Sequence, residues 1–199
     1  NAAKGKMALL NNNPAGYFMS AMVAGAFITL GGFVTFTLGS ILTAAGCTIT
    51  KVIMAFSFAS ALSLVVMAGA ELFTGNNFVM AAASFKKEVS WLDTLKLWVV
   101  CYLGNFVGAV ILVALFQLGG VPKGATGEYF ATIAAGKMGG TASALFFKGI
   151  LCNMLVCLAV WCCTKMKTES GKLIMIFWCI YIFMACGFEH SIANMSVMA

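Results

Sequence analysis

The sequence predicts a single all-helical integral membrane domain, residues 1–199, in which two helices are broken inside the bilayer. The composition is the first observation behind this prediction, because 62% of the 199 residues are hydrophobic and only 9% are charged. The second is that long apolar runs recur along the whole chain, with short polar loops and without alternation of period two. The third is a polar segment that interrupts one such run and recurs near the end of the chain.

The expected spans follow in order at about residues 17–38, 52–85, 95–118 and 142–163, with a fifth that begins near Leu173. The second run would extend about 50 Å as one helix, against a hydrocarbon core of about 30 Å. Polar residues lie inside it: Glu71, Thr74, Gly75, Asn76 and Asn77. We therefore expect a break at membrane depth, where protein or a water-filled cavity satisfies the backbone.

The polar segment occurs twice, as GAELFTGN at residues 69–76 and as GFEHSIAN at residues 187–194. Both copies fit the pattern G-x-E-x-x-x-x-N. Each lies on the second span of a three-span unit, one at about 14–118 and one at about 137–199, and the two units begin on opposite sides of the membrane. This arrangement is typical of an inverted repeat whose broken helices meet near the midplane. We expect the sixth helix of the repeat to lie outside this segment of chain.

The distribution of lysines predicts the orientation. Alternate loops carry unequal numbers, with Lys4, Lys6, Lys86, Lys87, Lys96, Lys165, Lys167 and Lys172 on one side and Lys51, Lys123 and Lys137 on the other. By the positive-inside rule the N-terminus is cytoplasmic, and the loops near residues 45 and 130 face outward.

His190 is the only histidine of the chain and lies in the second break. A histidine at membrane depth can donate a hydrogen bond or a proton to a passing anion, although a neutral histidine could also simply lock the loop. We expect Thr74 of the first break to hydrogen-bond His190 across the pseudo-twofold axis. Asn153, in the fourth span, must find a polar partner, either by lining a pore or by bonding a broken loop.

The remaining polar residues of the breaks have structural interpretations. Glu71 and Glu189 occupy equivalent repeat positions, and we expect them to accept backbone N–H bonds from the broken loops. Thr74, Asn76 and Asn194 are expected to cap half-helix N-termini, whose positive dipole ends suit an anion.

The charge balance favours anions, because the net charge is +6 and the chain contains no arginine. Topology alone could also produce this charge. Lys6 and Lys137 precede spans, and Lys148 lies about a turn into the fourth span, where snorkelling is the default behaviour.

Apolar residues flank the breaks: Phe58, Phe73, Phe183, Leu62 and Leu72. They would either pack against neighbours and lipid or form a constriction. The eight cysteines show no Cys-x-x-Cys or His/Cys ligand spacing, so we predict packing roles, no metal and no cofactor.

Four segments together resemble the formate/nitrite transporter family: ELFTGNN (71–77), GNFVGA (104–109), KGILCNMLVCLAVW (148–161) and GFEHSIANM (187–195). The resemblance covers about residues 14–198 and is strongest to the hydrosulfide channels of anaerobic bacteria, because of ELFTGNN and the cysteine-rich fourth span. It implies an aquaporin-like protomer of three plus three helices, assembled as a homo-pentamer in the bacterial inner membrane, with one pore per protomer.

The resemblance also implies roles for individual residues. It places the pore centre at His190, Thr74 and Asn153, a cytoplasmic constriction at Leu62 and Leu72, an outer constriction at Phe58, Phe73 and Phe183, and an outer vestibule lysine at Lys137. Lys148 stands where formate channels usually have an apolar residue.

We therefore predict a channel for small monovalent anions of weak acids, hydrosulfide first, then formate and nitrite. It would be neither an enzyme nor a nucleic-acid-binding protein. The first alternative is a formate or nitrite channel, or a proton-coupled transporter, of the same family. A neutral-solute aquaporin-like channel would need Asn-Pro-Ala motifs, which this sequence lacks. A membrane redox subunit could not form bis-histidine haem ligation from a single histidine, and a structural or sensory membrane protein would not need the two breaks.

Overall fold

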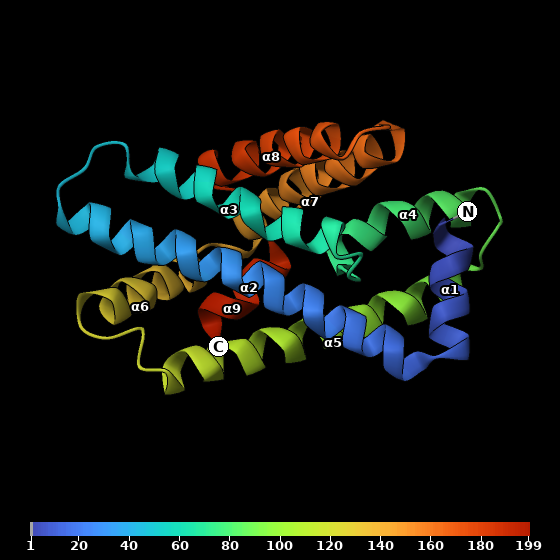
Figure 1. Cartoon of the computed structure of the whole chain (residues 1–199), viewed down its shortest axis with the longest axis horizontal. Helices are drawn as coiled ribbons and strands as arrows, with labels where there is room; N and C mark the ends of the chain where they lie inside the picture. The colour runs from blue at the N-terminus through green and yellow to red at the C-terminus, as the bar shows by residue number, and fades with distance from the viewer. Residues whose placement is uncertain (1) are drawn as a thin grey trace.

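The computed structural model describes residues 2–199, which fold into helices joined by short loops (Figure 1). The helices are α1 (Ala2–Asn12), α2 (Pro14–Ala44), α3 (Thr50–Met67), α4 (Phe73–Phe85), α5 (Trp91–Leu118), α6 (Ala125–Met138), α7 (Ala142–Lys165), α8 (Glu169–Ala185) and α9 (Ser191–Met198). Helix α2 runs along the long axis of the molecule and α1 crosses its N-terminal end (Figure 1).

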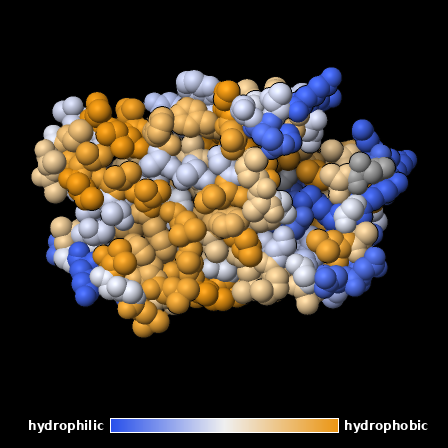
Figure 2. All heavy atoms as spheres, viewed as in Figure 1, coloured by the Kyte–Doolittle hydropathy of each residue, from blue (hydrophilic) through white to orange (hydrophobic). Residues whose placement is uncertain are grey.

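Four helices are long and apolar enough to cross a membrane, namely α2, α3, α5 and α7. Hydrophobic side chains cover the middle of the face shown in Figure 2, and hydrophilic ones gather toward the end that carries α1. In a bilayer, lipid would cover this hydrophobic surface, whereas a soluble protein would have to bury these side chains in its core. The protein is a multi-pass membrane protein.

The start of α2 was not predicted, since the sequence places the first span only from about residue 17. The side chain of Asn13 caps the helix by accepting a hydrogen bond from Gly16 N at 2.9 Å, and Pro14 occupies the first turn. Proline suits that position because its missing N–H has no partner there and its fixed φ is already helical. The NNNP segment therefore separates α1 from α2 with a single non-helical residue.

Helices α2 and α5 approach so closely that their backbones touch at glycines. A methyl group added to Gly108 would lie 1.9 Å from the carbonyl oxygen of Met22, and one added to Gly25 would lie 2.0 Å from that of Asn105. Small residues at such positions let helix backbones pack directly in a membrane. This contact fixes α5 beside α2 and carries Asn105 to the first break.

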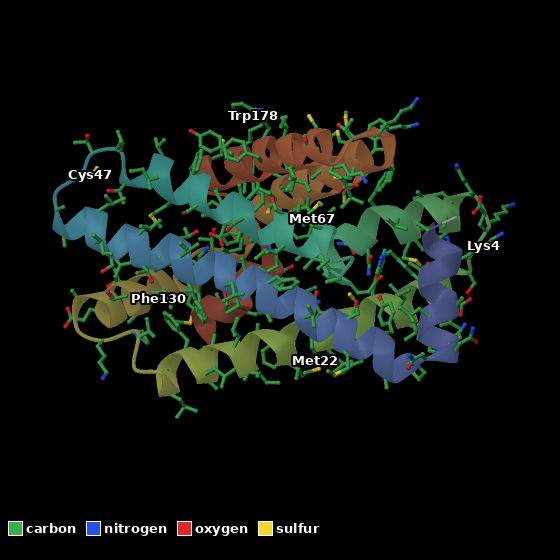
Figure 3. The ribbon with its side chains drawn as sticks, in the orientation of Figure 1. Lys4, Met22, Cys47, Met67, Phe130 and Trp178 are labelled. Atoms are coloured by element: carbon green, nitrogen blue, oxygen red, sulfur yellow. The ribbon has the colours of Figure 1, made fainter. Side chains whose placement is uncertain are left out.

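The predicted interruption of the 52–85 run is confirmed. Helix α3 ends at Met67, and α4 begins at Phe73 after a turn in which Gly69 has φ +66°. Met67 lies near the middle of the long axis, with Lys4 and Cys47 toward opposite ends (Figure 3). A second break separates α8 from α9, and there Gly187 has φ +71°. Both turns use the left-handed backbone region that favours glycine.

Helix α6 is an element that the sequence did not predict, because its segment was expected only as an outward loop. It is short and contains Glu128 and Lys137 near its two ends. None of its side chains is fully buried, and with 14 residues it is too short to span a membrane. Helix α6 lies over the end of α2 opposite α1 (Figure 1) and brings Lys137 to the second break.

Candidate functional site

The two breaks meet through one hydrogen bond. Thr74 Oγ1, in the first turn of α4, lies 3.2 Å from Nε2 of His190, the residue before α9. Both side chains are buried, at 3% and 4% exposure. The imidazole also stacks on Phe183, with ring centroids 5.7 Å apart and an interplanar angle of 17°. The structure therefore places the predicted pair in contact, although 116 residues separate the two in the chain.

The other ring nitrogen of His190 fixes its tautomer. Nδ1 accepts a hydrogen bond from the backbone N–H of Ala193 at 3.1 Å, which caps α9. An accepting Nδ1 carries no proton, so the neutral ring carries its proton on Nε2 and donates it to Thr74. The hydroxyl proton of Thr74 is then left to donate to another acceptor.

A carboxylate organises the first break. Glu71 accepts two hydrogen bonds of 2.7 Å from Lys6 Nζ of α1 and one of 2.8 Å from Asn76 Nδ2. Asn76 Nδ2 also donates to Tyr17 Oη at 3.1 Å. A charge this deeply buried is stable only when it is paired and hydrogen-bonded, so α1, α2 and α4 are joined at Glu71.

Helix α5 fastens the same loop from the other side. Asn105, fully buried, donates from Nδ2 to the carbonyl oxygens of Ala21 (2.7 Å) and Glu71 (2.9 Å). Its Oδ1 accepts from Phe73 N at 2.9 Å. Cys101 Sγ adds a contact of 3.2 Å to the Glu71 carbonyl. The backbone groups freed by the break are therefore satisfied by side chains.

The second break has a similar but smaller network. Glu189 Oε2 accepts from Lys137 Nζ of α6 at 2.6 Å and from Asn194 Nδ2 at 2.9 Å. Asn194 Oδ1 is buried and, among residues 2–199, has no hydrogen-bond partner. The lysine, glutamate and asparagine of this break thus match those of the first, whereas the supporting contacts differ.

The capping roles expected for three residues are wrong. Leu72 precedes α4 and gives it no side-chain cap, while Thr74 and Asn76 lie inside the first turn of the helix. His190, and not Asn194, caps α9. The asparagines bond the glutamates instead, since the path of each loop turns Asn76 and Asn194 back toward the carboxylates. The glutamates likewise accept from lysine and asparagine side chains rather than from backbone N–H groups.

Asn153 of α7 hydrogen-bonds side chains of α4 and of its own helix and does not contact the Thr74–His190 pair. Its Oδ1 accepts from Asn77 Nδ2 at 3.2 Å, and its Nδ2 donates to Cys157 Sγ at 3.3 Å. Cys157 Sγ in turn lies 3.8 Å from the carbonyl oxygen of Thr74. A polar chain therefore leads from α7 to the residue that contacts His190.

Two cavities approach the centre from opposite ends. The α1 cavity has a volume of about 290 Å³, and its lining includes Lys6, Leu62, Leu72, Cys163 and Lys172. The α6 cavity has a volume of about 550 Å³ and is lined by residues that include Lys51, Phe58, Lys137, Lys148, Phe183, Glu189, His190 and Asn194. Most of the predicted site residues therefore lie in one cavity or the other.

Buried apolar side chains lie in one cluster that both cavities adjoin. Leu62 and Leu72, on the α1 side, and Phe58 and Phe183, on the α6 side, are each exposed by 3% or less. The rings of Phe58 and Phe183 meet edge to face, with centroids 6.0 Å apart. Phe73 packs, partly buried, against the same cluster, and its ring also meets Tyr102 of α5 edge to face at 5.2 Å.

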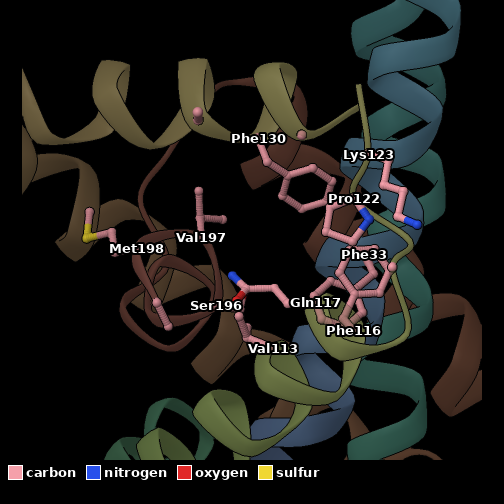
Figure 4. Close-up of a pocket in the computed structure, with 14 residues that line it drawn as sticks. Phe33, Val113, Phe116, Gln117, Pro122, Lys123, Phe130, Ser196, Val197 and Met198 are labelled. Atoms are coloured by element: carbon pink, nitrogen blue, oxygen red, sulfur yellow. The ribbon is translucent and has the colours of Figure 1, made fainter. Parts of the chain in front are cut away.

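A further cavity lies between α2, α5, α6 and α9 (Figure 4). Its volume is about 480 Å³, and its lining includes Phe33, Phe116, Lys123, Phe130 and Ser196. None of the residues predicted for the site lines it. In the described part of the chain, the eight cysteines are free thiols, and no group of three metal-ligating side chains is close enough to hold an ion.

Sequence reasoning missed three residues of the site: Asn105, Asn77 and Lys51. Asn105 could have been predicted from the sequence, since an asparagine between Gly104 and Gly108 in an apolar span has to find hydrogen-bond partners in the membrane. Lys51 was counted only for topology, because nothing in its sequence neighbourhood indicates the cavity that it faces.

The chain that carries this site is similar, over nearly its whole length, to a known class of membrane protein. The family model described as formate/nitrite transporter matches residues 1–199, and the chain belongs to that family. The nitrite transporter NirC of Escherichia coli K12 is 40% identical over 196 residues, which cover 94% of this chain and 69% of NirC.

Two solved structures are similar to this one. An FNT family ion channel superposes with a TM-score of 0.92 at 36% identity, covering 98% of this chain and 78% of that chain. A pentameric formate channel with formate bound superposes with a TM-score of 0.81 at 30% identity, covering 98% and 74%. The likeness therefore extends over nearly all of the present chain.

Proposed function

We propose that this protein is a channel for small monovalent anions of weak acids, with its pore along the two cavities and its centre at Thr74 and His190. The observation that carries the proposal is the pair of donors between two apolar constrictions. Nitrite and formate are the anions for which two similar proteins are named, the nitrite transporter NirC and the pentameric formate channel. Hydrosulfide is the anion that we place first, because the sequence of the first break and of α7 resembles hydrosulfide channels.

We propose the remaining architecture on the same basis. The two breaks belong to an inverted repeat, and the protomers form a homo-pentamer in the bacterial inner membrane. The N-terminus is cytoplasmic, so the α1 cavity opens inward and the α6 cavity outward. Lys148 draws anions toward the outer opening. Lys6 and Lys137, which were expected to do the same, line the two cavities but are paired with Glu71 and Glu189, so each pair adds little net charge.

The apolar constrictions pose an energy problem for any ion. Moving a bare monovalent ion from water into a medium of very low dielectric costs on the order of 20 kcal/mol in the idealised limit. Two remedies fit the site. Donors from Thr74, His190 and the N-terminal amides of α4 and α9 can replace water around the anion, or the anion can take up a proton and cross the constrictions as a neutral acid.

Hydrosulfide, formate and nitrite are all bases of weak acids, so the second remedy is open to each of them. In the proposed mechanism His190 Nε2–H and the Thr74 hydroxyl donate to the anion. His190 takes up one proton from the water of the α6 cavity and passes one from Nε2 to the anion, so the imidazole is neutral again and the anion leaves through a constriction as the neutral acid. Flux should therefore rise as the pH falls, because proton uptake by His190 from the cavity becomes more frequent. Chloride, which takes up no proton at these pH values, should cross poorly.

The test is flux in proteoliposomes of the complete protein, with hydrosulfide, formate, nitrite and chloride compared at several pH values. Rapid flux of the weak-acid anions with little chloride is expected, and the fastest anion identifies the preferred substrate. No flux above that of empty liposomes would overturn the proposal.

His190→Asn isolates the part of the mechanism that depends on the histidine. Asparagine is a strong N-cap, so α9 keeps a capping side chain, while the Nε2–H donor is lost. The pH dependence of flux should flatten in this variant. If it stays as in the unaltered protein, the proton-donating role of His190 is wrong even though the channel is real.

A further inference from the structure

We propose that the α6 cavity contains a second anion site, formed by Lys51 and Lys148, which binds small dianionic oxyanions such as sulfate. An anion held there blocks the pore instead of crossing it. The blocking role rests on the proposed function, because a block requires flux, whereas the binding itself does not.

The two lysines reach one cavity from different helices. Lys51 lies in the first turn of α3, Lys148 lies near the start of α7, and both line the space of about 550 Å³ above His190. The ion pairs of residues 2–199 join Lys6 to Glu71, Lys137 to Glu189 and Lys172 to Glu169. Neither Lys51 nor Lys148 therefore has a carboxylate partner in the described chain.

The charges that face this cavity do not cancel. Glu189 is its one acidic side chain, and it lies 2.6 Å from Lys137, so that pair is close to neutral. His190 is neutral while Nδ1 accepts the Ala193 amide. Lys51 and Lys148 leave two positive charges in a concave space walled partly by phenyl rings, where fields are focused and local anion concentrations rise.

The position of Lys148 supports a functional role. It follows two phenylalanines near the start of an apolar helix, where its ammonium group has to reach water, by snorkelling or through a cavity. Lys148 is exposed and lines the α6 cavity, so that its ammonium group can reach water there. A lysine that served only as a topology signal would have no need to face the cavity that leads to His190.

A dianion fits these two charges better than a monovalent anion does. Coulomb attraction grows with the product of the charges, so a dianion is held about twice as strongly at the same place. Sulfate stays dianionic near neutral pH and cannot become neutral by taking one proton. Because the Born cost grows with the square of the charge, the constriction at Phe58 and Phe183 is about fourfold more costly for it.

Calorimetry on the complete, purified protein tests the site directly. Sodium sulfate is titrated at constant ionic strength, with chloride as the balancing anion. Lys51→Gln and Lys148→Gln should each weaken sulfate binding by about three- to tenfold, and the double variant should abolish it. Lys148→Arg keeps the charge and should bind like the unaltered protein.

Lys123→Gln is the matched control, since it removes one lysine charge from the wall of the separate cavity in Figure 4. It should leave sulfate binding unchanged. No sulfate binding by the unaltered protein, or equal binding by the double variant, would overturn the site. A loss in Lys123→Gln as large as in Lys148→Gln would also overturn it, because the effect would then come from net charge alone.

Flux measurements test the block. Sulfate should slow the flux of a monovalent weak-acid anion in the unaltered protein, with each variant normalised to its own flux without sulfate. The half-inhibitory concentration should rise by the same three- to tenfold in Lys51→Gln and in Lys148→Gln. Sulfate binding without any anion flux would support the site but overturn the proposed function. Flux that sulfate inhibits as strongly in the double variant as in the unaltered protein would overturn the site.

Discussion

The two breaks use the same backbone device with different support. Each turns at a glycine with positive φ, Gly69 or Gly187, and each is followed by a glutamate that bonds a lysine from a short helix outside the spans. Asn76 of the first break donates to Tyr17, Glu71 and Cys101. Its counterpart in the second break, Asn194, donates only to Glu189 and leaves its carbonyl oxygen without a partner in the described chain.

The polar groups of the second break cap a helix and contact the other break. His190 caps α9 with one nitrogen and contacts Thr74 with the other, whereas the first break has no capping side chain and relies on Asn105. The comparison teaches that the same turn can act as a scaffold or as a site. We expect substitutions in the first break to lower stability and those in the second to change transport.

The largest difference should come from the two glutamates. Glu71→Ala leaves Lys6 and Asn76 without their partner in a buried place and should lower the free energy of unfolding by about 3–5 kcal/mol. Glu189→Ala should cost about 1–2 kcal/mol, because Lys137 can turn to water in the α6 cavity. Unfolding of the protein in detergent, followed by circular dichroism, measures both. Equal losses would show that the breaks are supported alike.

A second contrast involves two asparagines. Asn105→Ala removes three hydrogen bonds and leaves buried backbone groups unpaired, so we expect a loss of about 2–3 kcal/mol. Asn194→Ala removes one bond together with an unpartnered oxygen and should change stability by less than about 1 kcal/mol. The same unfolding measurement applies, and a larger loss for Asn194→Ala would reverse our assignment of scaffold and site.

Thr74 sharpens the comparison because it belongs to the first break and contacts the second. Thr74→Val removes the hydroxyl at nearly constant volume and should cost about 1 kcal/mol of stability. Its expected effect on weak-acid anion flux in proteoliposomes is larger, about tenfold, as for one lost hydrogen bond of about 1.4 kcal/mol at the centre. Thr74→Ser restores the donor and should recover most of the flux. Unchanged flux in the valine variant would remove Thr74 from the pore centre.

The smallest effect concerns the cap of α9. His190→Asn and His190→Ala both lose the Thr74 hydrogen bond and the stacking on Phe183, but His190→Asn should be the more stable of the two by about 0.5–1 kcal/mol, because asparagine caps α9 and alanine does not. Hydrogen exchange of the α9 amides reports this difference locally. Identical exchange in the two variants would mean that the Ala193 N–H bond contributes nothing to α9.

The sequence predicted those parts of the fold that follow from length and polarity. The 52–85 run had to break because it is too long for a bilayer, and its polar residues gave the place of the break. The contact between Thr74 and His190 followed from the repeat, since equivalent segments of an inverted pair meet near the midplane.

The sequence failed where partners come from elements without a strong pattern. Helices α1 and α6 are short and weakly apolar, so the lysines that they bring to Glu71 and Glu189 were predicted as topology signals and vestibule residues and not as partners of the glutamates. The capping assignments failed for a different reason. A cap depends on the path of the loop before the helix, and Asn76 and Asn194 turn back to the glutamates although their residue type suits a cap.

The sequence positions of the residues that contact the first break also set the order in which the two networks form during biosynthesis. Its partners, Lys6, Tyr17, Cys101 and Asn105, all precede residue 106, so that network can close while the ribosome is still making α6 and α7. Thr74 has to wait for His190, 116 residues later, which takes roughly 6–23 s at 5–20 residues per second. The nascent chain can thus complete its scaffold well before its transport centre exists.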